Sequence, residues 1–590
     1  MNRDLREKFP VDARWWLGVP GRHMRSLTLV WHRHDLRLHD NALYQGLSDD
    51  RAVLSVYVFE PASYARLPSI AEPAWDVART GPHTARVLLA AVDELRSALR
   101  ARGGELLVRH GDPASILPQL ALAHDADEVR WHEEPGTEEM ATAARVRSAM
   151  RGAGRRVLTE WGCTLYHPDD LPGPDEWAAL AHPRRKHQPK KRPAARACVG
   201  PTSGERAWRE RLDSMPRVMG DWRRAVRARA KPRPVLEPPE RLRLPAGEPP
   251  EAGDIPSLAH LMEPVVAVSV GAEGSDGSRP LFGLPAEVVR SIVARALEAP
   301  PAAGLSAAGE AAAHARLARF VGGGIAATAD RSLADVGLDA SSKLSVPLAL
   351  GCLSPRQVAA AAAAAGDEAA WLASHMEMRD FFVFSALAAG GALFRRDGWR
   401  PVAPQPAAAA AWRAPGEAHE AWARWATGTI GLPLPDAAMR ELLCTGYCSN
   451  RVRQNAASAL TKDLRIDWRA GAELFQWLLA DHEVCANWGN WAYFSGVGAD
   501  PKQRHFRTVS QQLKYDAAGR YVRAWLPELA GVGDEAALRP HAHAVAGWPE
   551  PLVDPATQLS WQDAARLEEC GRLICDDADD GQGPAGTTRE

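Results

Sequence analysis

The sequence predicts an α/β domain with a parallel sheet, followed by an all-α domain. Two patterns carry this prediction. Over residues 26–165, short apolar or β-branched runs alternate with helical segments, whereas from about residue 282 helical periodicity prevails and strand signals are few. With 590 residues, 46% of them hydrophobic, the chain is long enough to form more than one core.

The N-terminal part is expected to be Rossmann-like because its apolar runs are typical of strands buried in a parallel sheet. These runs are LTLVW at 27–31, VLSVYVF at 53–59, ELLVR at 105–109, EVRW at 128–131 and RVLTEWG at 156–162. Helical segments at 83–102 and 138–152 lie between them. The first loop, HRHDLRLHDN, has no GxGxxG pattern, so no dinucleotide site is expected there.

Composition divides the rest of the chain. Residues 1–25 are predicted to be an N-terminal extension, and 166–281, rich in proline, glycine and arginine, an interdomain linker. Within it, PRRKHQPKKRP at 183–193 predicts a solvated basic insertion or, alternatively, a nucleic-acid or nuclear-import patch. Residues 282–530 are predicted to form the helical domain, and 531–590 an irregular acidic tail.

Bulk properties exclude several classes of protein. The formal net charge of −2 gives no global attraction to polyanions, so any DNA contact must come from a local basic face. Eight scattered cysteines without CxxC spacing predict reduced intracellular thiols and no metal site. No apolar run is long enough for a membrane span, so a soluble protein is expected, with nucleus, cytoplasm and organelle all left open. A monomer is the expected oligomeric state, although nothing in the sequence determines it.

Tryptophan usage is unusual. The chain has 21 Trp against 8 Tyr and 11 Phe, and 12 of the tryptophans fall at or after Trp371. Any single buried Trp is more often a core residue than a functional one. The excess nevertheless indicates that the C-terminal half uses indoles.

Polar residues at helical spacing mark a candidate binding site between 441 and 525. Asn450 and Arg453 share one helix face, as do Asn487 and Trp491, and two acids, Asp481 and Glu483, precede the second pair. An amide beside a guanidinium suits a polar or anionic ligand, although an isolated N-x-x-R is more often an ordinary capped helix with a surface arginine.

A second candidate element is SSKLSVPLALGCLSPRQ at 341–357. Its hydroxyls, backbone N–H groups and ammonium could cradle a diphosphate. The alternative is a serine-rich turn that only caps a helix.

These residues carry a family resemblance. WHRHDLRLHDNALY at 31–44 resembles the opening of the cryptochrome/photolyase family. Other segments resemble the DASH cryptochromes in particular: WGCTLYHPDDLP at 161–172, TGTIGLPLPDAAMRELLCTGYCSNRVRQ at 427–454, ALTKDLRIDWRAGAELF at 459–475, ANWGNWAYFSGVGADP at 486–501 and YDAAGRYVRAWLPEL at 515–529. The similarity runs in order over about 26–530, with departures in the linker.

The resemblance implies an FAD folded within the helical domain. The residues that would hold its phosphates are Ser341, Ser342, Leu344 and Ser345, with Lys343 nearby. The residues that would contact the rest of the cofactor are Arg379, Asp380, Asn450, Arg453, Asp481, Glu483 and Asn487, the last facing flavin N5.

The resemblance also implies an electron route and an antenna. Trp491 and Trp468 match the inner and middle members of the tryptophan chain that re-reduces photoexcited flavin. The spacing of the outer member departs from the family; Trp412 is the first candidate and Trp422 the second. The antenna in DASH proteins is methenyltetrahydrofolate, and Glu134, within HEEPGTEE at 132–139, is the acid expected to bind it.

The expected lesion pocket departs from the family at three positions. Ala327 replaces a tyrosine four residues before Arg331, His375 replaces a glutamate, and Met378 replaces the tryptophan that precedes Arg379. Methionine lacks the flat face on which a flipped base stacks.

Two residues on the other side of this pocket, Gln454 and Tyr493, keep DASH-like identities. The function implied is light-driven electron transfer to cyclobutane pyrimidine dimers in mainly single-stranded DNA, with His375 as a proton or hydrogen-bond donor. The alternative is a blue-light photoreceptor read by a signalling partner. A third possibility, a nucleic-acid-binding or flavin-storage protein without photochemistry, explains the tryptophans poorly.

Overall fold

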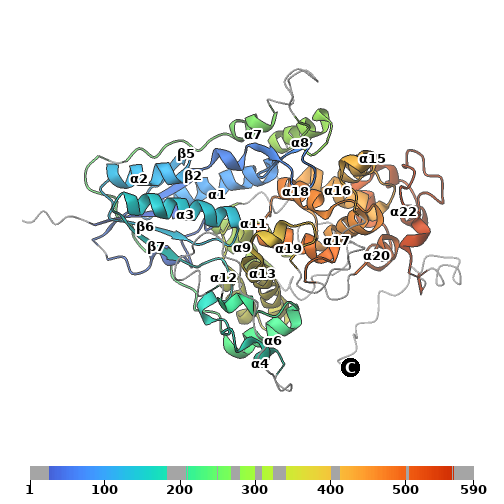
Figure 1. Cartoon of the computed structure of the whole chain (residues 1–590). Coiled ribbons are helices and arrows are strands. Elements are labelled where there is room, and N and C mark those ends of the chain that lie inside the picture. Colours follow the sequence, from blue (N-terminus) through green and yellow to red (C-terminus); the bar gives the residue numbers. More distant parts are fainter. Residues whose placement is uncertain are drawn as a thin grey trace, which may run out of the picture.

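The structure is a computed structural model. It describes residues 26–48, 50–182, 208, 210–248, 250–266, 279–298, 308–322, 341–399, 412–499, 504–560 and 562–563. The N-terminal extension, the basic insertion, Ala327 and Arg331 lie outside these ranges. Figure 1 shows the α/β domain on one side of the molecule and the helices of the C-terminal half on the other.

The N-terminal domain is built on a five-stranded sheet in the order β5-β2-β1-β6-β7, in which every neighbouring pair is parallel. The sheet strands are β1 (Leu27–His32), β2 (Ala52–Phe59), β5 (Leu106–His110), β6 (Glu128–His132) and β7 (Arg156–Glu160). The remaining two, β3 (Arg66–Pro68) and β4 (Asp76–Ala78), form a separate antiparallel pair. The predicted parallel sheet is confirmed.

Helices cover both faces of this sheet, because successive strand residues point to opposite sides. Leu29 and Trp31 of β1 pack in one cluster with α2 (Pro113–Ala123) and α3 (Thr137–Gly152). Val30 packs in the other cluster, with α1 (Pro82–Arg100). All six residues of β1 are therefore buried.

The region predicted as a linker contains helices that pack on the rest of the protein. They are α4 (Trp177–Ala181), α6 (Met219–Arg229) and α7 (Leu258–Val266). Trp222 of α6 is fully buried, and its ring meets Phe381 edge-on at 5.7 Å. In this region, proline and arginine content therefore does not mark an unstructured connection.

The C-terminal half is helical, as predicted. Its α-helices are α8 (Ala286–Glu298), α9 (Glu310–Gly322), α11 (Ser345–Ala349), α12 (Pro355–Ala365), α13 (Ala370–Ala389), α15 (His419–Thr427), α16 (Pro433–Thr445), α17 (Asn450–Ser458), α18 (Trp468–Leu478), α19 (Val484–Ser495), α20 (Thr508–Tyr515), α21 (Arg520–Trp525) and α22 (Asp534–Leu538). A π-helical turn, Ala459–Asp463, follows α17 directly.

Short 3₁₀ turns complete the described secondary structure. They are Ala42–Tyr44, Pro61–Ser63, Pro168–Asp170, Asp367–Ala369, Gly390–Phe394, Gly416–Ala418, Pro527–Leu529 and Pro555–Gln558. The last lies in the segment predicted as an irregular tail. There the Leu552 N–H donates to the Ile430 carbonyl at 2.9 Å and Gln558 is fully buried, so the chain stays packed on the helical domain well beyond residue 530.

The two domains are joined by buried charged side chains. Asp40, fully buried after β1, is paired with Arg356 of α12 at 2.8 Å. Glu310 of α9 accepts backbone N–H groups from Leu38 and His39, both at 2.8 Å. Because these groups come from the first loop and from the helical half, the first loop is part of the domain interface.

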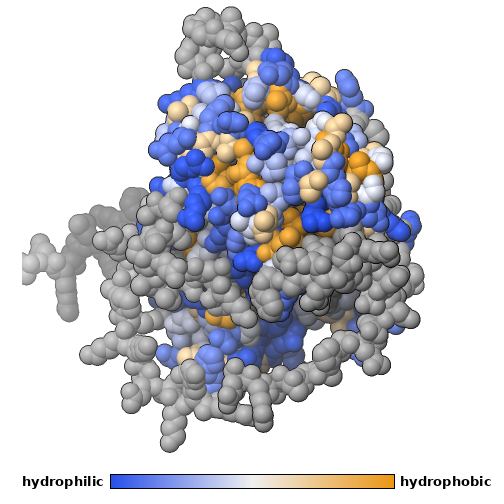
Figure 2. All heavy atoms as spheres, turned by 90° about the vertical axis from the view of Figure 1, so that its right-hand side faces the viewer, coloured by the Kyte–Doolittle hydropathy of each residue, from blue (hydrophilic) through white to orange (hydrophobic). Residues whose placement is uncertain are grey.

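No helix in the described part of the chain is long and apolar enough to cross a membrane. On the face shown in Figure 2, hydrophobic side chains gather in several separate groups among hydrophilic ones. Large exposed hydrophobic side chains are few among the described residues: Ile70, Leu122, Val218 and Leu297.

Asp380 offers a test of the domain joint. Its two carboxylate oxygens accept the backbone N–H groups of Leu165 and Tyr166, both at 2.9 Å. An amide has one acceptor oxygen, so Asp380→Asn turns an N–H₂ group toward one of these donors. We expect this variant to lower the free energy of unfolding by ~1–3 kcal/mol, measured by urea denaturation. The matched control is the exposed Asp397→Asn, expected to change it by less than ~0.5 kcal/mol. Equal effects would contradict this role of Asp380.

Candidate functional site

The serine-rich element forms a loop whose backbone carbonyls accept hydrogen bonds from an arginine. Lys343 has a left-handed backbone, with φ of 50°. Arg316 of α9 donates from Nε to the Ser342 carbonyl at 2.9 Å and from Nη2 to the Ser341 carbonyl at 2.6 Å. The guanidinium therefore satisfies two backbone carbonyls and fixes the course of the loop.

Tyr447 connects this loop to α17. Its hydroxyl lies 3.5 Å from Ser341 Oγ, and Lys343 Nζ sits 4.7 Å from the centre of its ring. Arg453 Cζ lies 5.4 Å from the same ring centre. Burial raises the pKa of Tyr447 to about 12, so the phenol stays neutral. Tyr447 therefore lies in contact with both the serine-rich loop and Arg453.

Arg453 is fixed by two acceptors. Its Nη2 is 2.9 Å from Asp481 Oδ2, and its Nε donates to the Cys448 carbonyl at 2.8 Å. The other oxygen of Asp481, Oδ1, is buried and accepts from no group in the described part of the chain. A buried carboxylate oxygen without a donor is a binding position for an N–H or hydroxyl group of a ligand.

Glu483 and Asn487 belong to the first turns of α19. Glu483 caps the helix, accepting the N–H groups of Cys485 and Ala486 at 2.9 Å each. The Asn487 side chain donates to the Ala472 carbonyl at 2.9 Å, which orients its amide. The Asn487 oxygen therefore remains available as an acceptor.

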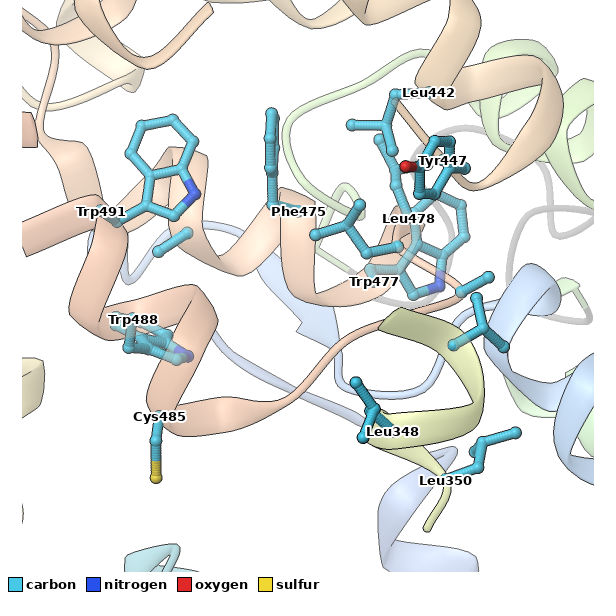
Figure 3. Packing of buried hydrophobic residues seen from close by; sticks show 14 of the residues in the cluster. Leu348, Leu350, Leu442, Tyr447, Phe475, Trp477, Leu478, Cys485, Trp488 and Trp491 are labelled. Atoms are coloured by element: carbon cyan, nitrogen blue, oxygen red, sulfur yellow. The ribbon is translucent and has the colours of Figure 1, made fainter. Parts of the chain in front are cut away.

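Arg453, Asp481, Glu483 and Asn487 meet in one cavity. Its lining includes Asn450, Arg453, Asp481, Glu483, Asn487 and Trp491. One wall is aromatic, because Phe475 meets the Trp491 ring edge-on at 5.0 Å (Figure 3). At Gly471 an added Cβ would come within 2.3 Å of the Trp491 ring, so the missing side chain lets α18 approach it.

Seven of the twelve predicted FAD contacts do not line this cavity. Five of them are the serine-loop residues Ser341, Ser342, Lys343, Leu344 and Ser345, and the other two are Arg379 and Asp380. Arg379 donates to the Cys163 carbonyl, and Asp380 uses both oxygens on backbone N–H groups, as described above. Both hold the segment that follows β7 onto α13.

A second cavity lies between the two domains and includes Arg379, Glu134 and Glu483 in its lining. It opens at the carboxyl ends of β1, β6 and β7, where the strand order reverses between β1 and β6. Glu134 is 2.9 Å from Arg33 Nη2 and 2.8 Å from His34 Nδ1. Although burial raises the pKa of Glu134, Arg33 and His34 lower it to about 2, so the acid is ionised.

The structure brings two of the three predicted relay tryptophans together. Trp468 donates its indole N–H to the Arg396 carbonyl at 3.0 Å, and the Arg396 guanidinium donates to the Trp412 carbonyl. The Trp468 ring contacts Trp488, with 5.8 Å between centroids. The ring contacts of Trp491 are instead with Phe475 and Trp425.

The four described residues of the expected lesion pocket all keep some exposed surface. They are His375, Met378, Gln454 and Tyr493. His375 meets the Trp371 ring edge-on at 4.9 Å, and the Tyr493 hydroxyl accepts from Arg504 at 2.6 Å. Gln454 accepts from Arg451 at 3.1 Å.

Sequence reasoning missed several residues of the site. Arg316, Tyr447, Arg396 and Trp488 all contact predicted site residues. Tyr447 lies three residues before Asn450 and could have been suspected. For Arg316, on a helix separate from the loop that it holds, the sequence carries no signal.

A parallel α/β sheet domain joined to a helical domain, with polar and aromatic side chains gathered in a pocket of the helical half, is the arrangement of photolyase-type proteins. A family model described as "DNA photolyase" matches residues 28–197, and one described as "FAD binding domain of DNA photolyase" matches 371–565.

Whole-chain comparisons agree. Cryptochrome DASH of Danio rerio is 33% identical over 511 residues, covering 85% of this chain and 83% of the relative. Cryptochrome DASH of Gloeobacter violaceus is 34% identical over 515 residues, covering 85% and 86%. The crystal structure of a Synechocystis sp. PCC6803 cryptochrome aligns with a TM-score of 0.70 and 29% identity over 93% of this chain and all of the other. The chain belongs to the cryptochrome/photolyase family, within its DASH group, and carries that family's FAD-binding domain.

The Arg316 contacts can be tested through FAD affinity. Arg316→Met removes both donors to the serine loop, so we expect the dissociation constant for FAD to rise roughly tenfold, equivalent to ~1.4 kcal/mol. Flavin fluorescence titration of the apoprotein measures it. Arg319→Met, an exposed arginine three residues along the same helix, is the control and should leave the affinity unchanged. An unchanged affinity in Arg316→Met would contradict this role.

Proposed function

We propose that the protein is a blue-light-driven DNA repair enzyme that transfers an electron from reduced FAD to cyclobutane pyrimidine dimers in mainly single-stranded DNA. The observation that carries the proposal is the convergence of Asn450, Arg453, Asp481 and Asn487 on one cavity walled by Trp491. Amide, guanidinium, carboxylate and indole are the groups that a buried flavin nucleotide requires around it.

The donor and acceptor set fits FAD. Ser341, Ser342 and Ser345 supply hydroxyls for the diphosphate, with the Lys343 ammonium beside them and the buried Leu344 anchoring the loop. The free Asp481 oxygen can accept from a ribose hydroxyl or a ring N–H. When bound, FAD supplies the light absorption and the transferable electron.

The protein's own residues stabilise charge on the bound flavin and position the protons around it. The Arg453 guanidinium, held in place by Asp481, is a fixed cation next to the cavity and stabilises negative charge that develops there. The Asn487 amide can donate or accept, so it can hold a ring nitrogen in either protonation state. Trp491, Trp468 and Trp412 supply an electron route, with Arg396 bridging the last two.

The DNA contact is proposed for the partly exposed residues of the lesion pocket. Gln454 and Tyr493 offer hydrogen bonds and an aromatic face, and His375 can donate to the dimer radical anion. Met378 fills space but offers no flat surface, and such base stacking contributes ~1–3 kcal/mol per base. The proposed lesion affinity is therefore reduced relative to a pocket with Trp at this position.

The test is blue-light repair of a dimer-containing single-stranded oligonucleotide by FAD-loaded, chemically reduced protein. We expect repair by the wild type, and roughly tenfold tighter binding of the oligonucleotide by Met378→Trp because a stacking face is restored. Repair is measured by dimer loss and binding by fluorescence anisotropy. The undamaged oligonucleotide is the control.

An absence of repair would contradict the proposal. If the same protein still photoreduces its flavin, and loses that response in Trp491→Phe, the result favours the photoreceptor. In that case the altered charge near Arg453 and Asp481 would be read by a partner protein rather than by DNA.

We further propose methenyltetrahydrofolate as the antenna, bound in the interdomain cavity with Glu134 as acceptor. An ionised, buried carboxylate there can accept the N–H groups of a pterin ring.

Glu134→Gln removes this charge, so we expect the folate to be lost on gel filtration and the folate band to vanish from the absorption spectrum. The FAD content should stay constant. The exposed Glu138→Gln is the control. Retention of folate by Glu134→Gln would contradict the assignment.

A further inference from the structure

The ring contacts of Trp491 lead away from Trp468. Trp491 meets Trp425 with 6.1 Å between centroids, and Trp425 meets Trp422 at 5.4 Å. Trp422 in turn meets Trp75 at 5.8 Å. Four indoles therefore run in unbroken contact from the polar cavity through α15 to the residue that precedes β4 in the α/β domain.

The two middle members are sealed in the core. Trp425 is fully buried and donates its indole N–H to the Ala456 carbonyl at 3.0 Å. Trp422 is 1% exposed and donates to the Phe282 carbonyl at 2.8 Å. A backbone carbonyl is too weak a base to take a proton from an oxidised indole. An oxidised Trp425 or Trp422 therefore remains a radical cation, which the neighbouring indole can reduce.

Trp75, the last of the four indoles, keeps a small exposed surface. Trp75 is 7% exposed, and its ring is 6.2 Å from that of His419, which is exposed. Gly283 fixes the ring position, since an added Cβ would come within 2.3 Å of it, and the Gly283 φ of 61° also favours glycine. An oxidised Trp75 can release its indole proton to water there. The neutral radical that results no longer returns its oxidising equivalent to Trp422.

We propose that Trp75 is a second terminal electron donor, reached from Trp491 through Trp425 and Trp422. This rests on the proposed photoreduction through Trp491. Each indole passes one electron to its oxidised inner neighbour, and Trp75 finally loses one electron and its Nε1 proton to become a neutral radical. A thiol reductant in solution returns one electron and one proton to it.

Two single variants and their combination test the branch. Trp422→Phe interrupts it and Trp412→Phe interrupts the other route. We expect either alone to keep most of the photoreduction yield, and the double variant to lose it roughly tenfold or more, because parallel routes are non-additive. Trp477→Phe, which shortens a buried indole outside both routes, is the control for the structural effect of replacing a buried Trp with Phe. A loss in Trp412→Phe as large as in the double variant would overturn the proposal.

A second readout does not depend on yield. After illumination of the flavin-loaded protein without thiol and in the presence of oxygen, peptide mass spectrometry should find oxidised Trp75 in the wild type. It should find none in Trp422→Phe. Unoxidised Trp75 in the wild type, or equal oxidation in both proteins, would overturn the branch.

Trp491→Phe separates the two hypotheses, because both routes begin there. If this variant photoreduces as well as the wild type, the proposed electron supply through Trp491 is wrong. If it loses photoreduction while Trp422→Phe changes neither yield nor Trp75 oxidation, only the branch is wrong.

Discussion

The ion pair between Arg453 and Asp481 holds the candidate site together. It links α17 to the turn before α19, and the chain on both sides of it lines the cavity. The Asp481 side chain is buried whereas that of Arg453 is 22% exposed, so the cost of removing one partner should lie below the ~3–5 kcal/mol typical of a fully buried pair. A second acceptor, the Cys448 carbonyl, replaces part of the hydration that the guanidinium has lost. The carboxylate lacks such a replacement at Oδ1, which accepts from no donor among the described groups.

In the proposed site, that imbalance would couple FAD binding to folding. A buried oxygen without a donor costs ~1–3 kcal/mol, and a ligand that supplies a donor would recover this free energy. Binding to the folded state alone would then stabilise it. Arg316 satisfies two backbone carbonyls of the serine loop in advance of any ligand.

Backbone carbonyls position four tryptophans of the helical domain. Trp412, Trp422, Trp425 and Trp468 each donate an indole N–H to a carbonyl, at 2.8 to 3.0 Å. Buried indoles normally need such a partner. Here the bonds also fix ring orientation and keep the proton in place, and both properties suit groups that exchange electrons. For Trp412 the acceptor is Thr461, in the π-helical turn after α17.

The sequence alone determined the fold class and much of the site's composition. Strand alternation and helical periodicity are local properties, so β1 and α3 fall close to their predicted ranges. Asn450 and Arg453 were predicted to share a face because helical spacing dictates it. The motifs also indicated the family.

Only the tertiary structure decided which groups meet. Asp380 is committed to backbone N–H groups 214 and 215 residues away, and Arg316 reaches a loop 25 residues further along the chain. The order of indoles from Trp491 to Trp75 depends on how α15, α18 and α19 pack against the α/β domain. Contacts between distant segments arise from packing of whole elements, and no periodicity within a segment encodes them.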